Sequence, residues 1–253
     1  MQRPFNAASL SEVIAKTEAV LLGGWTTWAM SNHDNLRVVT RAALSPELQG
    51  DERALAKLLL AALLSFRGGA CVYQGEEFGL TEAKIAFEDL RDPFGIEFWP
   101  DFKGRDGCRT PMPWSSRLPN GGFSVAKPWL PMPPEHLPIA VDEQEKDPHS
   151  VLQMFRRFAA WRRQHPSLVT GDLALVQANE PILAFERRGN GGRILCLFNF
   201  SNQNVAQPVA CPWRPLDGHG FDSARLEQEV VLLAPFGAWF GTPAEPDLIS
   251  VLG

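Results

Sequence analysis

The sequence predicts an α/β fold in which parallel strands are followed by a small antiparallel β domain. Two short, β-prone apolar runs flank a long helical pattern, and polar residues follow both runs directly. From about residue 168 the helical spacing gives way to short alternating strands separated by turns. A chain of 253 residues has room for two such parts. We therefore expect a first domain over residues 1–167 and an all-β domain over residues 168–253.

The first predicted elements are a helix and a buried strand. Residues 9–22 have helical spacing, with Ser9 or Ser11 as the capping residue and two glycines as the stop signal. Residues 25–30, WTTWAM, are apolar and β-prone, and the polar cluster SNHDN follows them. This pattern predicts a buried strand that delivers polar side chains at its carboxyl end.

The clearest helical pattern covers residues 51–67. Asp51 and Glu52 lie at its positive amino end, and two glycines close it. Residues 70–74, ACVYQ, form another short buried strand, which is followed by the polar residues GEE. A strand, a helix and a second strand in this order predict a βαβ unit with parallel strands. Both strands place polar residues at their carboxyl ends, where α/β barrels carry their active sites.

The middle of the chain, residues 80–147, is rich in Pro, Gly and Trp and predicts a long irregular region. Irregular segments of this length are uncommon unless they have a function. Asp147 and Pro148 then begin a helix that extends to about His165, with apolar residues spaced for one buried face. The predicted strands of the β domain are LALVQA, ILAFERR, GRILCLFNFS and EVVLLAPFGAWF.

Composition narrows the class of protein. The formal net charge of −5 argues against nucleic-acid binding, which needs a basic surface. No apolar run approaches the roughly 20 residues that span a bilayer, and the first residues lack a signal-peptide pattern. Cys71, Cys108, Cys196 and Cys211 lack zinc-ligand spacing, and two of them lie in apolar strand-like runs. We expect buried free thiols, no metal, no cofactor and a cytoplasmic location.

Three motifs occur in a fixed order along the chain: WAMSNHDNLR at residues 28–37, YQGEEFG at residues 73–79 and GRDGCRTPMPW at residues 104–114. They resemble the NHD signature, the YQGEE(I/L)G segment and the RDxxRTPMxW block of α-glucosidases and oligo-1,6-glucosidases in the α-amylase superfamily, glycoside hydrolase family 13. The resemblance covers nearly the whole chain. It implies the carboxyl-terminal part of a (β/α)8 TIM barrel, about strands 7–8 and their helices, followed by a small antiparallel β-sandwich domain.

The resemblance also implies roles for individual residues. Asp34 corresponds to the family's third catalytic carboxylate, which grips two hydroxyls of the sugar at the cleavage site. His33 corresponds to a neighbouring hydrogen-bond donor to that sugar. An arginine of the RDxxRTP block lines the bottom of the pocket, and it is either Arg105, the first choice, or Arg109. A fixed carboxylate and oriented donors suit an oxocarbenium-like transition state, and a charged, bidentate arginine suits the pocket wall.

The same residues also have structural interpretations. By itself, an Asn-His-Asp sequence at a strand end indicates a cap for the next turn. Glu76 and Glu77 are expected to brace the pocket or bind backbone amides rather than to take part in catalysis. Trp99, Trp114 and Trp129 have rings that suit stacking on sugar, but packing under the long loop is their expected role.

Two segments that the family uses do not occur upstream of Asp34: the GFRxD-type segment with the nucleophile and the Glu motif with the acid/base. A retaining glycosidase needs both carboxylates, about 5–5.5 Å apart. GFDSARL at residues 220–226 is only superficially similar, because it falls in the predicted β domain. We therefore expect the chain to start just before the seventh strand and to be inactive alone. Its expected partners are the missing amino-terminal barrel segment or a second copy of the chain.

Other functions are compatible with these motifs. A transglycosidase, such as a trehalose synthase or a sucrose-using enzyme, would keep the fold and change the acceptor. A non-catalytic superfamily member would act as a partner subunit, and a carbohydrate-binding module would use the β domain alone. The RTPMPW sequence favours an α-glucosidase, and the intact NHD and RDxxRTP segments argue against a non-catalytic role. The expected substrate is an α-glucoside or an oligosaccharide.

Overall fold

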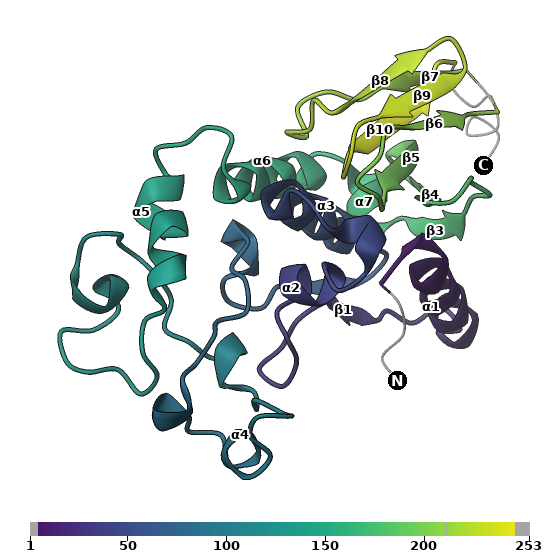
Figure 1. Ribbon diagram of the computed structural model, residues 1–253. Coiled ribbons are helices and arrows are strands. Elements are labelled where there is room, and N and C mark those ends of the chain that lie inside the picture. The colour runs from purple at the N-terminus through teal and green to yellow at the C-terminus, as the bar shows by residue number, and fades with distance from the viewer. Residues whose placement is uncertain (1–4, 211, 246–253) are drawn as a thin grey trace.

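The computed structural model describes residues 5–210 and 212–245 (Figure 1). Helices and irregular segments form one part of the molecule, and antiparallel strands gather in the other, at the upper right of Figure 1. Within the described ranges, no helix has the length and apolarity needed to cross a membrane.

The first part begins with five short elements: α1 (Ala7–Val20), β1 (Thr27–Ala29), α2 (Val38–Ala42), α3 (Glu52–Ser65) and β2 (Gly69–Cys71). Asn6 caps α1, because its side chain accepts a hydrogen bond from the amide of Ser9 at 2.9 Å. The expected caps, Ser9 and Ser11, therefore lie inside the helix. Asp51 caps α3 in the same way through the amides of Arg53 and Ala54.

The predicted βαβ unit is present. β1 and β2 pair in parallel, with Trp28 opposite Ala70 and Ala29 opposite Cys71. The connecting helix α3 is buried at almost every position from Leu55 to Ser65. A helix that is apolar on all sides needs cover on all sides, and α2, α6 and the strands of the β part pack against it. Both strands consequently end at the same edge, where the polar segments that follow them meet.

The prediction that both strands are buried is wrong. β1 and β2 alternate between exposed and partly buried positions, and the side chain of Cys71 is exposed. Among the described residues the two strands form a sheet of their own, so no third strand covers their outer sides. Cys108 and Cys196 are buried free thiols as expected, and Cys211 lies outside the described residues.

The middle of the chain is mostly irregular, as predicted. It carries short helical turns: η3 (Phe87–Asp89), α4 (Pro93–Glu97), η4 (Asp106–Cys108), η5 (Pro119–Gly122), η6 (Pro134–Ile139) and α5 (Val141–Gln144). Two further turns precede it, η1 (Pro46–Leu48) between α2 and α3, and η2 (Glu76–Phe78) after β2. Two helices follow, α6 (Val151–Arg163) and α7 (Pro166–Thr170). The expected start of α6 at Asp147 is wrong, because Ser150 caps it through the amide of Gln153 at 3.1 Å.

Two antiparallel sheets form the β part. The larger has the order β3-β4-β5-β10-β7 and the smaller the order β6-β9-β8. The strands are β3 (Asp172–Leu175), β4 (Ile182–Gly189), β5 (Gly192–Asn199), β6 (Val205–Pro208), β7 (Trp213–Pro215), β8 (Ala224–Glu227), β9 (Val230–Leu233) and β10 (Ala238–Pro243). The run EVVLLAPFGAWF, predicted as one strand, is β9, a turn and β10, and the sequence analysis missed β6, β7 and β8.

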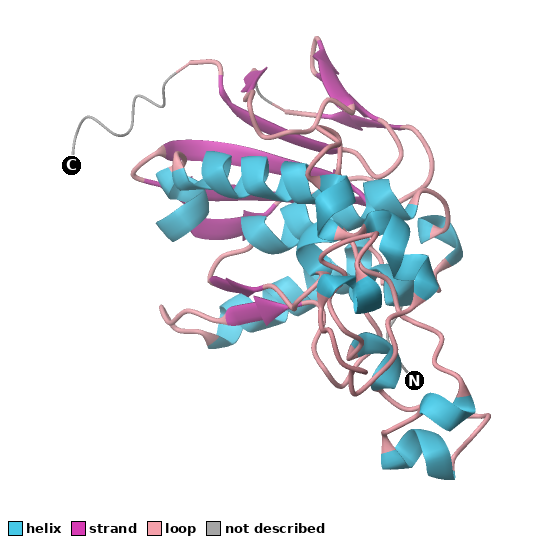
Figure 2. Ribbon diagram, turned by 90° about the vertical axis from the view of Figure 1, so that its left-hand side faces the viewer, coloured by secondary structure: helices cyan, strands magenta, loops and turns pink. Residues whose placement is uncertain are grey.

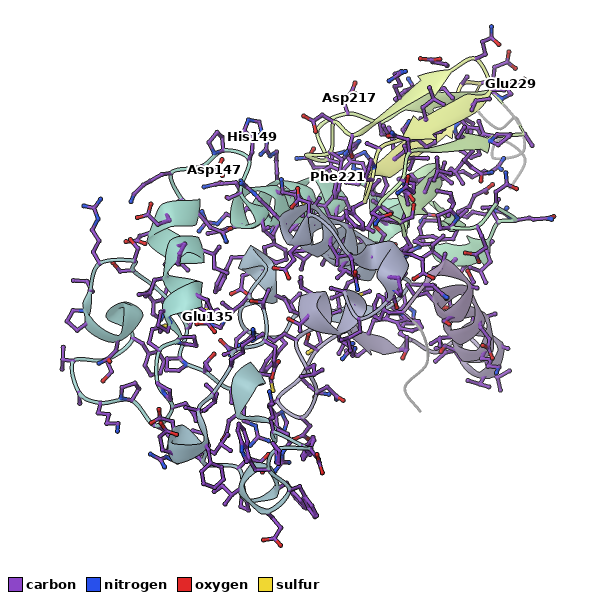
Figure 3. All side chains as sticks on the ribbon, viewed as in Figure 1. Glu135, Asp147, His149, Asp217, Phe221 and Glu229 are labelled. Atoms are coloured by element: carbon purple, nitrogen blue, oxygen red, sulfur yellow. The ribbon has the colours of Figure 1, made fainter. Side chains whose placement is uncertain are left out.

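The core is continuous from the helices into the larger sheet. Phe158 and Trp161 of α6 pack against Phe240 of β10, with ring centroids 5.4 and 5.1 Å away. Phe221, labelled in Figure 3 near this junction, contacts Phe158 edge-to-face. Figure 2 shows the same arrangement from the side, with helices packed along the strands. A second apolar cluster, which includes Trp239, fills the space between the two sheets.

A buried arginine joins the two parts. Arg187 of β4 is 0% exposed, and its guanidinium donates to the carbonyls of Ser65 and Phe66 at the end of α3. It also donates to the carbonyls of Leu168 and Gly171, beside α7. These are the carbonyls that a helix end leaves without partners, and they carry the negative end of its dipole. Arg187 therefore fastens the β part to the end of α3.

Two buried histidines predict acid sensitivity. Burial lowers the pKa of His136 and of His219 to about 4, from an ordinary value of about 6.5. As pH falls below 6.5 the unfolded chain therefore takes up protons before the folded chain does. Stability is complete above pH 6.5 and is lost between 6.5 and 4, by about 2–3 kcal/mol for each histidine. Urea unfolding at pH 7 and pH 4.5 measures this loss.

Variants assign the acid sensitivity to these sites. His136→Leu is expected to flatten the pH dependence of the free energy of unfolding. His149→Leu is the matched control, because His149 is exposed in the loop before α6 (Figure 3). An equal pH dependence in all three proteins would show that His136 is not the group that titrates.

Candidate active site

The segment after β1 forms a turn that presents two side chains. Oδ1 of Asn32 accepts hydrogen bonds from the amide of Asp34 at 2.9 Å and from Nδ2 of Asn35 at 3.0 Å. The hydroxyl of Ser31 accepts one from the amide of Val38 at 2.8 Å, where α2 begins. The Asn-His-Asp sequence does organise a turn, and that turn leaves His33 and Asp34 exposed rather than buried.

Arg37 holds the three motif segments together. Its buried guanidinium donates to the carbonyl of Gln74 at 2.7 Å and to that of Cys108 at 3.0 Å. Its backbone amide donates to Glu82 at 2.9 Å. Burial lowers the pKa of Arg37, and the nearby Tyr73 and Glu82 oppose this effect. The sequence analysis missed Arg37, although it lies three residues after Asp34 in the first motif.

The two glutamates of the second motif bind backbone amides, as expected. Glu76 accepts from the amide of Tyr73 at 2.8 Å, and Glu77 accepts from the amide of Gly75 at 2.7 Å. Burial raises the pKa of Glu76. These carboxylates shape the loop that follows β2.

The four residues singled out from the sequence lie together. Nη1 of Arg105 is 3.1 Å and Nη2 of Arg109 is 3.0 Å from the same oxygen, Oδ1 of Asp34. The other oxygen, Oδ2, is 3.4 Å from Nε2 of His33. Nε of Arg109 also donates to the carbonyl oxygen of His33 at 2.7 Å. Both arginines that the sequence left as alternatives therefore contact the Asp34 carboxylate.

Asp92 positions Arg105. Its two oxygens accept hydrogen bonds from Nε and Nη2 of Arg105 at 2.8 and 2.9 Å, a bidentate pair. The Asp92 side chain is fully buried, and the hydrogen bonds from Arg105 hold the pKa of its carboxyl well below the usual range. Asp92 also caps α4 through the amide of Phe94. The sequence analysis missed this residue, because nothing near it in the chain indicates a partner 13 residues away.

The geometry leaves Asp34 able to bind a polar ligand. Two guanidinium groups fix Oδ1, while the side chain as a whole is 49% exposed. Its remaining acceptor capacity on Oδ2, with the ring of His33 beside it, suits neighbouring hydroxyl groups. Within the part of the chain that the structure describes, no group of His, Cys, Asp and Glu has the arrangement of a metal site.

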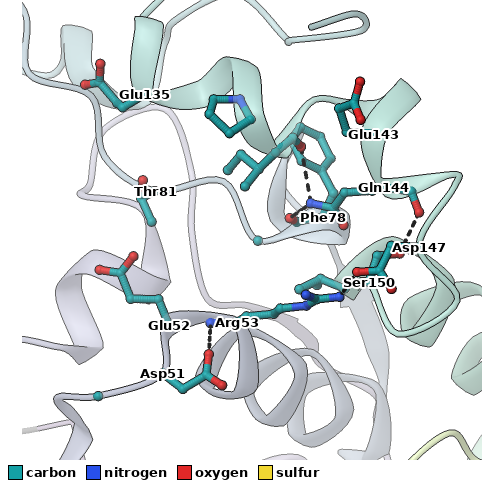
Figure 4. A pocket seen from close by; sticks show the side chains of 15 residues that line it. Asp51, Glu52, Arg53, Phe78, Thr81, Glu135, Glu143, Gln144, Asp147 and Ser150 are labelled. Atoms are coloured by element: carbon teal, nitrogen blue, oxygen red, sulfur yellow. Dashed lines mark hydrogen bonds and ion pairs between the residues drawn. The ribbon is translucent and has the colours of Figure 1, made fainter.

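A sizeable cavity lies away from Asp34. A cavity of about 670 Å³ opens between the start of α3, the loop after β2 and the start of α6 (Figure 4). Asp51 and Ser150 on its wall cap helices, and Arg53 pairs with Asp147 across it. Since every one of these groups has a structural partner, we place the candidate site at Asp34 and not in this cavity.

The three tryptophans that were expected to pack under the long loop are more exposed than predicted. Trp99, Trp114 and Trp129 are 37%, 50% and 61% exposed. Trp99 is partly packed, because its ring lies 5.6 Å from that of Phe87 and Lys103 lies over it. The exposed parts of these rings are accessible for stacking on a sugar, which is the other role that the sequence suggested.

Comparison with known proteins identifies the family. The model of the alpha-amylase catalytic domain matches residues 1–171. The chain belongs to the alpha-amylase family. This alpha-amylase family chain is similar to a "Probable alpha-glucosidase" of Rhizobium meliloti, with 48% identity over 91% of this chain. It is also similar to an "Oligo-1,6-glucosidase" of Parageobacillus thermoglucosidasius, with 29% identity over 79% of this chain. The matches cover 41% and 39% of those two proteins, so the chain spans about two fifths of the length of these relatives.

Solved structures of the alpha-amylase family confirm the predicted fold. The chain superposes on the alpha-glucosyl transfer enzyme XgtA with a TM-score of 0.88 and 42% identity, over 94% of this chain and 44% of that one. It superposes on the trehalulose synthase MutB of Pseudomonas mesoacidophila with a TM-score of 0.79 and 24% identity, over 94% of this chain and 47% of that one. At that identity the second likeness supports the fold alone. The division at residue 167 stays a prediction.

Proposed function

We propose that this chain contributes one wall of the glucose-binding site to an enzyme of the retaining α-glucosidase type, which acts on α-glucosidic bonds of oligosaccharides. The observation that carries the proposal is the convergence of His33, Arg105 and Arg109 on the carboxylate of Asp34. Two motifs that are far apart in the sequence supply these groups. The 48% identity to a protein named as a probable alpha-glucosidase supports the same function.

In this proposal, Asp34 accepts hydrogen bonds from two hydroxyls of the bound glucose. Arg105 and Arg109 hold the carboxylate so that binding requires no reorientation of its charge. Hydrogen bonds to sugar hydroxyls strengthen as the sugar ring distorts and positive charge develops on it. They therefore stabilise the transition state of bond cleavage more than the bound substrate. His33 would donate to the same sugar.

A second candidate is α-glucosyl transfer to an acceptor other than water. It shares the proposed glucose site and differs in what attacks the glucosyl group. The 42% identity to a structure named as an alpha-glucosyl transfer enzyme supports it. We place hydrolysis first because the more similar curated relative, at 48%, carries a glucosidase name.

Complementation tests the proposal. The chain is assayed with p-nitrophenyl α-glucoside alone and after coexpression with the part of the Rhizobium meliloti relative that this chain does not match. We expect no turnover by the 253-residue chain, because the family's nucleophile and acid/base segments do not occur upstream of Asp34. We expect turnover by the complemented protein.

The products separate the two candidates. Equal release of glucose and p-nitrophenol indicates hydrolysis, whereas p-nitrophenol in excess over glucose, with a new glucoside formed, indicates transfer. Turnover by the chain alone, or a complex that forms but has no turnover, would contradict the proposal.

A further inference from the structure

Six large apolar side chains lie exposed on one short stretch of the chain, around α4. They are between 37% and 56% exposed: Phe87, Phe94, Ile96, Phe98, Trp99 and Phe102. Figure 1 shows α4 at the bottom of the view, projecting away from α3 and α6. Single exposed apolar residues are ordinary, but a gathered patch of this kind indicates a binding surface.

The patch rests on a well-ordered frame. Asp106 accepts hydrogen bonds from the amides of Arg91 and Asp92 at 2.6 and 2.8 Å. A Cβ atom on Gly95 would lie 2.7 Å from the carbonyl oxygen of Lys103, so the two arms of the loop are in direct contact there. The backbone that carries the aromatic residues is therefore held in place, and a ligand would not have to order the loop on binding.

The patch is continuous with the candidate site. The ring of Phe94 lies 5.5 Å from the guanidinium carbon of Arg105, which in turn bonds Asp34. The ring of Phe98 follows, nearly parallel to that of Phe94, with an angle of 10° and centroids 6.4 Å apart. The charged groups at Asp34, which suit sugar hydroxyls, therefore lie next to the rings of Phe94 and Phe98, whose faces suit a flat apolar group.

We propose that Phe94 and Phe98 form a stacking platform for the ring attached to the bound glucose, either a second pyranose or an aromatic aglycone. This inference rests on the proposed function, since Asp34 must hold the glucose. A pyranose carries hydroxyls on its rim and C–H groups on its faces, so one ligand can bond Asp34 through the first ring and stack through the second. The continuity through Arg105 favours a sugar ligand over a second copy of the chain.

A pair of probes isolates the platform. Methyl α-glucoside and phenyl α-glucoside carry the same glucose and differ only in the ring of the aglycone. Calorimetric titration of the chain is expected to give about 3- to 10-fold tighter binding of the phenyl compound, as one aromatic contact contributes. Phe98→Leu is expected to remove this advantage and to leave the affinity for the methyl compound unchanged.

Matched variants complete the experiment. Phe123→Leu is the control, because Phe123 is exposed to almost the same extent as Phe98, 51% against 53%, on a different loop. Asp34→Asn is expected to weaken both probes equally and to keep their ratio. Since Phe98 and Phe123 are both exposed, neither substitution removes core packing.

Each outcome decides a separate point. Equal affinity for the two probes, or an advantage that survives Phe98→Leu, would overturn the platform and leave the glucose site standing. If neither probe binds the chain, the platform is overturned, while turnover in the complementation assay decides the proposed function separately. A chain that dimerises in sedimentation, and becomes monomeric with Phe98→Leu, would assign the patch to contact between copies and overturn the inference.

Discussion

In the complemented enzyme, Asp34→Asn is expected to lower kcat/KM for p-nitrophenyl α-glucoside about 10³-fold. The amide keeps the size of the side chain and removes the charge that two arginines and the substrate hydroxyls share. Arg105 and Arg109 would then face an uncharged group at about 3 Å. Because these contacts strengthen in the transition state, most of the loss is expected in kcat rather than in KM.

The control is Asp217→Asn, the same substitution at an exposed position of the β part, between β7 and β8 (Figure 3). It is expected to leave both kinetic constants within about twofold of the unsubstituted protein, as remote surface substitutions usually do. An Asp34→Asn enzyme that retains more than a tenth of the activity would exclude Asp34 as a catalytic residue. Near-UV circular dichroism of each variant checks that the fold is retained.

The second large effect concerns stability. Arg187→Met is expected to lower the free energy of unfolding by about 3–5 kcal/mol, because it removes a buried donor from several carbonyls at once. The affected carbonyls include those of Ser65, Phe66 and Gly171. Burial lowers the pKa of Arg187 to about 10, so its guanidinium is still charged at neutral pH. Urea unfolding followed by circular dichroism at pH 7 measures the loss.

Arg188→Met is the matched control for this prediction. Arg188 is the next residue of β4, its side chain is 53% exposed, and it pairs with Glu186 at 2.8 Å. An ion pair of this exposure contributes about 0–1 kcal/mol. If the two substitutions destabilise the chain equally, Arg187 does not fasten the β part to α3.

Much of the candidate site could be predicted from sequence, because its chemistry sits in contiguous motifs. The resemblance of residues 28–37 and 104–114 to family motifs singled out His33, Asp34, Arg105 and Arg109, and the structure brings all four together. The βαβ unit was predictable from local patterns, because strand and helix periodicities depend on neighbouring residues. The roles of the four residues stay a proposal until the substitutions are measured.

The tertiary structure alone decided how these groups are held. Asp92 carries no local signal. Arg37 lies in the first motif, but its role depends on segments distant in the chain. The exposure of side chains could not be predicted from the sequence either. The apolar residues around Cys71 and Trp99 predict burial, but both side chains are exposed, because burial depends on which elements cover a side chain.

The sequence by itself determined the family, the parallel βαβ unit and the four residues at the site, because each is encoded in a short run or its periodicity. Only the tertiary structure decided that Arg105 and Arg109 share one oxygen of Asp34 and that Phe94 lies over Arg105. The physical reason is that a hydrogen bond or a ring contact depends on distances of a few ångströms between segments, and the path of the long irregular region sets those distances.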